Sequence, residues 1–211
     1  ASDRETYVAT MQLVNPPLRL PDGRTVAQQA LSIRRARFID GGLRERIGLL
    51  NTGPATVPLE LSIAVDADFG DMFAVRGYRP SPPAAVTVER VTGGLLLSAT
   101  GADGVLRQTR VTTAPAPDAV TDRTLRFGAE LAPQERLVVE VTVVPTEDGH
   151  RPDIGSERPF DAAIELLRDR YAAFLAAGTR IETGDGRLDD LLRRSALDLR
   201  PLVDHTPSGP M

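Results

Sequence analysis

Cysteine, lysine and tryptophan are absent from this sequence of 211 residues. Without cysteine the chain has neither a disulfide framework nor a thiolate metal site. The absence of disulfides agrees with a cytoplasmic protein, which is the location we expect. Aromatic residues make up only 4% of the chain. This scarcity argues against a stand-alone carbohydrate-binding module, because such modules stack sugars on exposed aromatic rings.

An excess of positive charge is also missing, since the formal net charge is -4 and the pI is about 5.3. Nucleic-acid binding requires a basic face, so nucleic acid is excluded as a partner. No run of about 18 apolar residues occurs, and we therefore expect no transmembrane helix and no membrane partner. The N-terminal residues Ala1–Glu5 lack the apolar core of a signal peptide and do not begin with methionine. We expect the sequence to be part of a longer chain.

The sequence does contain a series of short segments with the two-residue period of β-strands. Residues 57–66 are the clearest, because apolar side chains at the odd positions alternate with Pro, Glu, Ser, Ala and Asp. Leu31–Ile39 and Leu43–Asn51 predict a hairpin across an Asp-Gly-Gly turn. Further strands are predicted at residues 7–13, 85–92, 95–100, 105–113, 124–131 and 136–144. This series predicts a mainly β fold, with a β-sandwich over residues 1–145.

The periodicity changes after residue 145. Residues 146–158 have the composition of a polar linker, and residues 159–211 form a helical segment. Apolar residues recur at helical spacing between Pro159 and Gly178, which are typical boundary residues of a helix. A second helix has one largely apolar face, formed by Leu188, Leu191, Leu192, Ser195, Leu199 and Leu202. Because an amphipathic helix buries its apolar face, the two helices either lie on the sandwich or begin a helical domain.

The segment Asp66–Arg76 combines three carboxylates, two phenylalanines and a glycine at the end of the clearest strand. Asp68, Asp71 and Arg76 are candidate substrate contacts, since a carboxylate accepts several hydrogen bonds from sugar hydroxyls and arginine donates them. In the alternative interpretation the acids cap turns and pair with arginine, while both phenylalanines fill the core. Two acids on one turn do not enclose a scissile bond, so we predict no catalytic residue in this chain.

Other charged residues give weaker signals. Arginines surround Glu45 on the predicted hairpin, and they indicate cross-strand ion pairs or, alternatively, a polyanion-binding patch: Arg34, Arg35, Arg37, Arg44 and Arg46. His150 and His205 lie far apart without metal-ligand spacing, so we predict no metal site. Gly101–Gly104 is interpreted as a turn, because neither a lysine nor a helix start follows it, and we expect no cofactor.

Five segments resemble, in the same order, the N-terminal domain of bacterial glycogen-debranching-type proteins. These are amylo-α-1,6-glucosidase-like glycoside hydrolases. The resemblance is carried by residues 31–38 (LSIRRARF), 42–46 (GLRER), 66–76 (DADFGDMFAVR), 101–110 (GADGVLRQTR) and 181–188 (IETGDGRL). It covers roughly residues 7–205. The sequence departs from the family at Ala74, where the family usually has an acidic residue, and it lacks the family's first strands before Ala1.

The resemblance implies a supersandwich-like β-sandwich followed by a catalytic (α/α) barrel of six helical hairpins, which the second helix opens. It implies that the catalytic carboxylates lie beyond Met211, one assisting the leaving group and one activating water. We therefore expect a non-catalytic N-terminal domain of an α-glucan-acting glycoside hydrolase. Its partners would be an α-glucan or oligosaccharide and the catalytic barrel in cis. A stand-alone carbohydrate-binding or assembly module is the alternative, and the oligomeric state is left open.

Overall fold

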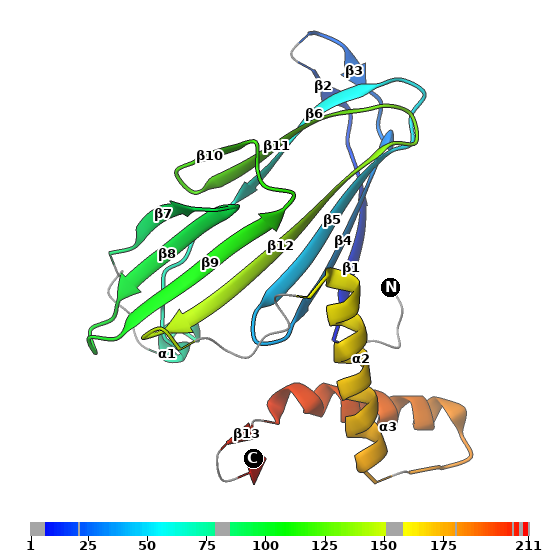
Figure 1. The fold of residues 1–211 in the computed structure, drawn as a ribbon. Helices are drawn as coiled ribbons and strands as arrows, with labels where there is room; N and C mark the ends of the chain where they lie inside the picture. Colours follow the sequence, from blue (N-terminus) through cyan, green and yellow to red (C-terminus); the bar gives the residue numbers. More distant parts are fainter. Residues whose placement is uncertain are drawn as a thin grey trace.

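The computed structural model describes residues 7–20, 22–78, 85–150, 158–179, 181–203, 205–206 and 209–210. Its largest element is a seven-stranded antiparallel sheet in the order β1-β4-β5-β12-β9-β8-β7 (Figure 1). The strands of this large sheet are β1 (Ala9–Val14), β4 (Leu31–Ile39), β5 (Leu43–Asn51), β7 (Thr87–Val91), β8 (Gly94–Thr100), β9 (Leu106–Ala114) and β12 (Arg136–Glu147).

A smaller sheet of three strands has the order β10-β11-β6. It consists of β6 (Val57–Ala64), β10 (Ala119–Thr121) and β11 (Thr124–Leu131). Two short hairpins complete the β-structure, β2 (Leu18–Arg19) with β3 (Thr25–Val26) and β13 (His205–Thr206) with β14 (Gly209–Pro210).

The main core lies between the large and the small sheet. Leu95, Leu97 and Val139 of the large sheet are completely inaccessible to solvent, as is Leu125 of the small sheet. Burying a side chain of this size contributes about 1.5–3 kcal/mol. The apolar residues at odd positions of β6 join this core, as the alternation predicts. The predicted β-sandwich is therefore confirmed, with two sheets of unequal size.

Two long helices follow the sandwich, α2 (Phe160–Ala177) and α3 (Gly186–Leu199), which continues into a 3₁₀ turn at Arg200–Leu202. The first turn of α2 packs at one end of the large sheet, on the face opposite the small sheet, and the rest of the helix extends past that end (Figure 1). Along β4, Ile33 contacts the sandwich core, whereas Phe38 belongs to a second core cluster with Phe160 of α2. This division follows from the strand geometry, because residues separated by an odd number point to opposite faces.

Arg46 of β5 links α2 to the large sheet through hydrogen bonds. The Arg46 guanidinium donates to Glu140 of β12 at 2.7 and 3.0 Å and to Asp161 of α2 at 2.7 and 3.0 Å. It also lies 4.4 Å from the centre of the Phe160 ring. The hydrogen bond to Asp161 raises the pKa of Arg46, and the same bond lowers the pKa of Asp161. Arg46 therefore joins two strands and a helix.

Of the predicted cross-strand ion pairs around Glu45, those of Arg35 and Arg37 form, and both are less solvated than expected. Arg35 and Arg37 donate to Glu45 at 2.6 and 3.0 Å. Glu45 is buried, with 8% of its side chain exposed. The two guanidiniums thus satisfy a carboxylate that is largely withdrawn from water, and such charges are stable in the interior only when they are paired.

The sequence predicts the bounds of the regular elements unevenly. The hairpin formed by β4 and β5 has the predicted bounds, and so does β11. Strand β12 runs to Glu147, three residues past the predicted end at Val144, because its pairing with β9 continues to Arg107. The short elements β2, β3, β10 and the helical turn α1 (Met72–Val75) were not predicted. In the part of the chain that the structure describes, no helix has the length and apolarity to span a membrane.

Candidate functional site

The segment Asp66–Arg76 leaves the end of β6 and forms the turn of helix α1. Asp71 is the N-cap of α1, where its Oδ1 accepts from the backbone N–H of Phe73 and Ala74 at 2.9 and 2.8 Å. Asp68 accepts from the N–H of Gly70 at 3.0 Å. Arg76 is the C-cap of the same turn. The structure thus gives Asp68 and Asp71 a capping role. That Asp68, Asp71 and Arg76 contact a substrate stays a prediction.

The two phenylalanines of this segment have different environments. Phe69 packs against the main core, as the capping interpretation predicts. Phe73 is 49% exposed, so its predicted burial is wrong. Helix α1 is a single short turn, and its residues are not covered by the sheets. Other exposed apolar side chains surround Phe73: Met72, Val75 and Tyr78.

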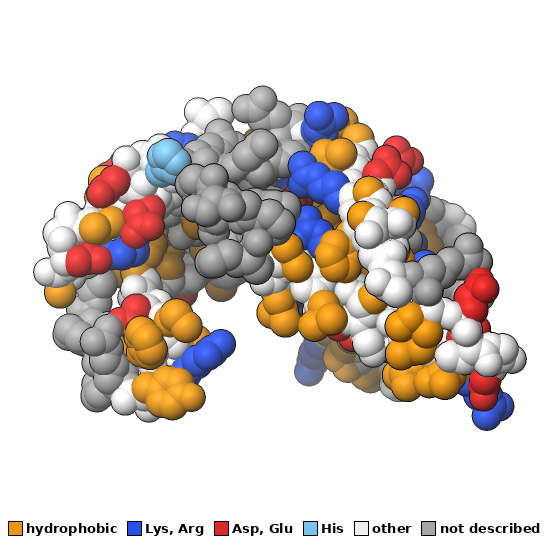
Figure 2. Space-filling view, turned by 90° about the horizontal axis from the view of Figure 1, so that it is seen from below, with side chains coloured by type: hydrophobic (Ala, Val, Ile, Leu, Met, Phe, Trp, Pro, Cys, Tyr) orange, Lys and Arg blue, Asp and Glu red, His pale blue; other side chains and the backbone are white. Residues whose placement is uncertain are grey.

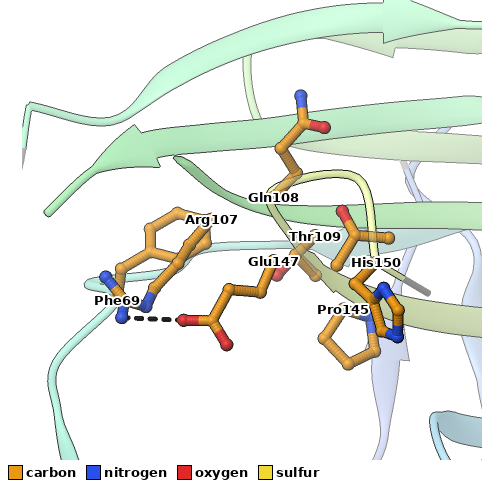
Figure 3. A pocket seen from close by; sticks show the side chains of 8 residues that line it. Phe69, Arg107, Gln108, Thr109, Pro145, Glu147 and His150 are labelled. Carbon is orange, nitrogen blue, oxygen red and sulfur yellow. Dashed lines mark hydrogen bonds and ion pairs between the residues drawn. The ribbon is translucent and has the colours of Figure 1, made fainter. Parts of the chain in front are cut away.

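A cavity of about 450 Å³ lies between this segment and the paired strands β9 and β12 (Figure 3). We call it the Phe69 pocket. It is lined by Phe69, Arg107, Gln108, Thr109, Pro145, Thr146, Glu147 and His150. The register places Arg107 opposite Glu147 and Thr109 opposite Pro145, so these four side chains share one face of the sheet. Gln108 points away from this face in Figure 3 and donates to Ser98 at 3.1 Å.

Arg107 is the central charged group of the Phe69 pocket. Its guanidinium donates to both oxygens of Asp103, at 3.0 and 2.9 Å, and to Oε1 of Glu147 at 2.8 Å. The hydrogen bonds from Arg107 lower the pKa of Asp103 to about 2, and the pKa of Arg107 is raised by the same contact. Asp103 and Arg107 are therefore both charged at neutral pH, and the guanidinium is held in a fixed plane.

A wide hollow separates two lobes on the lower face of the molecule (Figure 2). One lobe lies below β7–β9 with α1, and the other carries α2 and α3 (Figures 1 and 2). Hydrophobic side chains gather on both lobes. Helix α3 contributes exposed leucines, with exposed fractions of 42% for Leu188, 59% for Leu191 and 58% for Leu199. Of the described residues of α3, only Leu197 is buried.

In the described part of the chain, no three or more His, Asp or Glu side chains are arranged so that they could hold a metal ion. The family described as the N-terminal domain of some glycogen debranching enzymes matches residues 1–142. The chain belongs to this family. The match covers the sandwich except for the second half of its last strand, β12. Among curated protein sequences, none matches the chain.

Two solved structures are similar to this member of the debranching-enzyme family. One is described as a kojibiose phosphorylase from the human microbiome, with 9% sequence identity, a TM-score of 0.49, and coverage of 90% of this chain. The other is a polysaccharide lyase, with 16% identity, a TM-score of 0.34, and coverage of 59% of this chain. The chain spans 23% of the length of the first protein and 21% of the second.

Sequence reasoning missed most residues of the Phe69 pocket in this family member. Arg107, Glu147 and His150 were not singled out as a group, because 40 residues separate the arginine from the glutamate. The available signal was the opposite charge of Arg107, in the strand predicted at residues 105–113, and of Glu147, three residues past the strand predicted at residues 136–144. That signal becomes specific only when β9 and β12 are known to pair in this register.

Proposed function

We propose that this chain is the non-catalytic N-terminal domain of an α-glucan-acting glycoside hydrolase of the glycogen-debranching type, and that it supports a catalytic helical barrel in cis. Membership of the debranching-enzyme family supports the type of parent protein. The uncovered apolar face of α3 is the observation that carries the supporting role. It provides a surface on which further helices of the same polypeptide pack.

Most residues of α3 are exposed, and they include leucines of the face that the sequence marks as apolar. Leu188, Leu191 and Leu199 lie on this face, and Leu202 continues it in the 3₁₀ turn with 75% exposure. Leu197 instead points into the cluster formed by Phe160, Leu167 and Tyr171. Full burial of each leucine contributes about 1.5–3 kcal/mol, so a helix that leaves several leucines in water gains stability when another element covers them.

We place Asp68, Asp71 and Arg76 at the edge of the parent enzyme's substrate entrance, beside the hollow. Their segment projects from the sandwich at α1, where Phe73 and Tyr78 are exposed next to Arg76. A carboxylate has several acceptor sites, so a capping bond through one oxygen is compatible with a further bond from a sugar hydroxyl. The barrel supplies the catalytic carboxylates in this proposal, and the present chain shapes the approach to them.

The first test concerns the polypeptide itself. An antibody raised against the chain is expected to detect, in a denaturing blot of the source cells, a band several times heavier than 22.7 kDa. The purified chain is expected to release no glucose from glycogen or maltooligosaccharides, because glycoside hydrolysis requires two carboxylates across the scissile bond. A band at 22.7 kDa, or saturable glucose release by the pure chain, overturns the proposal.

A matched pair of leucine variants tests the orientation of α3. Leu197→Ala removes a side chain that is 3% exposed, and we expect it to cost about 2–5 kcal/mol of unfolding free energy. Leu191→Ala removes a side chain that is 59% exposed, and we expect a change within about 0.5 kcal/mol in the isolated chain. Urea unfolding measures both. Equal losses would show that the leucine face already packs inside the chain, against the proposal.

A further inference from the structure

We infer that the Phe69 pocket binds one uncharged pyranose ring. This inference rests on the proposed function for the origin of the sugar, an α-glucan. The cavity of about 450 Å³ falls in the range of about 300–1,000 Å³ that is typical of small-molecule sites. It is large enough for one sugar ring and is open at the surface, so the neighbouring rings of an oligosaccharide can extend into solvent.

The walls combine apolar surface with a few polar groups. Phe69 and Pro145 line two sides of the cavity, and Arg107, Glu147 and Thr109 lie between them (Figure 3). An aromatic ring matches the apolar C–H face of a pyranose, as it matches other flat apolar groups. Oriented polar groups beside apolar surface are the usual form of a small-molecule site.

The polar side chains of the Phe69 pocket can form hydrogen bonds with sugar hydroxyls. Oε1 of Glu147 accepts from Arg107, and the carboxylate retains acceptor capacity at Oε2. The guanidinium is immobilised by Asp103 on one side and Glu147 on the other. Each sugar hydroxyl both donates and accepts, so it pairs with a fixed carboxylate, the Thr109 hydroxyl or the His150 imidazole. Arg107 and Glu147 hold each other before a ligand binds, so part of their ordering entropy is already lost.

The charge of the pocket excludes an anionic ligand. Arg107 carries one positive charge, and Asp103 and Glu147 carry two negative charges against it. The guanidinium is thus fully neutralised by its carboxylates. A phosphorylated sugar would bring a further negative charge next to Glu147, which is unfavourable at short range. The ligand chemistry that fits is a neutral, hydroxyl-rich ring.

The backbone of Phe69 is consistent with a functional role. Its φ is 49°, in the left-handed region that non-glycine residues seldom occupy. Residues in such conformations are strained and are frequent at binding sites. At this position the strained backbone directs the ring between the main core and the cavity.

The test uses the two histidines of the chain as reporters. His150 lines the pocket, whereas His205 lies in β13 and provides an internal control. We expect maltotriose to shift the imidazole proton signals of His150 in the NMR spectrum, saturably and with a dissociation constant of about 1 mM, while the His205 signals stay in place. No shift of His150 at up to about 50 mM maltotriose overturns the inference.

Two glutamate variants sharpen the assignment. Glu147→Gln removes the charge and the ion pair with Arg107, and we expect at least a tenfold weaker effect of maltotriose on His150. Glu130→Gln changes an exposed glutamate of β11, which is not among the residues that line the pocket, and should leave the titration unchanged. Equal titrations of wild type and Glu147→Gln, or tighter binding of glucose 1-phosphate than of maltotriose, contradict the inference.

The two proposals fail separately. The size of the cellular polypeptide and the inactivity of the pure chain decide the proposed function, and neither depends on the pocket. A band several times heavier than 22.7 kDa, together with His150 signals that maltotriose does not shift, overturns the sugar site and leaves the proposed function in place. A band at 22.7 kDa together with a saturable His150 shift keeps the sugar site and removes the supporting role.

Discussion

Phe160→Ala is expected to lower the unfolding free energy by about 3–5 kcal/mol, which is the range for truncation of a buried phenylalanine. Phe160 is 2% exposed and begins helix α2. Its ring contacts Phe38 of β4 edge to face, with ring centres 5.2 Å apart. The Arg46 guanidinium covers the ring at 4.4 Å. The substitution therefore removes packing on both the sheet side and the charged side of the same contact.

The helices should lose the most stability, because Phe160 packs α2 against the sheet. We expect hydrogen exchange to rise more in α2 than in β8, whose Leu95 and Leu97 lie in the separate main core. Thermal or urea unfolding measures the change in stability, and hydrogen exchange by mass spectrometry localises it.

Phe73→Ala is the matched control for this substitution. Phe73 is 49% exposed on α1, and the same change of side chain there should cost no more than about 1 kcal/mol. If the two variants lose the same stability, Phe160 does not hold α2 on the sheet. Exchange that rises equally in α2 and β8 would contradict the separation of the two cores.

Gly94→Ala is the second substitution with a large expected effect, a loss of about 3 kcal/mol or more. Gly94 is the first residue of β8, directly after the turn residue Gly93. A Cβ at this position would overlap the carbonyl oxygen of Val111 and lie 2.9 Å from Cα of Thr112. Both are backbone atoms of β9, so no side-chain rotation relieves the overlap and the strands must separate.

Gly186→Ala is the control for the second substitution. Gly186 begins α3, and a Cβ there meets no atom within 4 Å. Since alanine restricts the unfolded chain and favours the helix, we expect a gain of about 0.5 kcal/mol. Urea unfolding of both variants gives the comparison. A neutral Gly94→Ala would show that β8 and β9 are not as close at this end as the structure places them.

The elements of the fold were largely predictable because their signals are local. The alternation at residues 57–66 gave β6, the Asp-Gly-Gly turn gave the hairpin of β4 and β5, and Pro159 with Gly178 bounded α2. Short elements without periodicity were missed, α1 among them. Its N-cap Asp71 was noted as an acid that caps a turn, but four residues are too few to show a helical period.

The sequence by itself determined the fold class, the family resemblance and the apolar face of α3, because strand alternation, turn residues and helical spacing depend on neighbours along the chain. Only the tertiary structure decided that β12 lies between β5 and β9, and with it the register that brings Arg107 to Glu147. It also decided that Leu197 is buried while Leu191 faces solvent. Register and burial depend on contacts between distant segments, and local patterns carry no information about which distant segments meet.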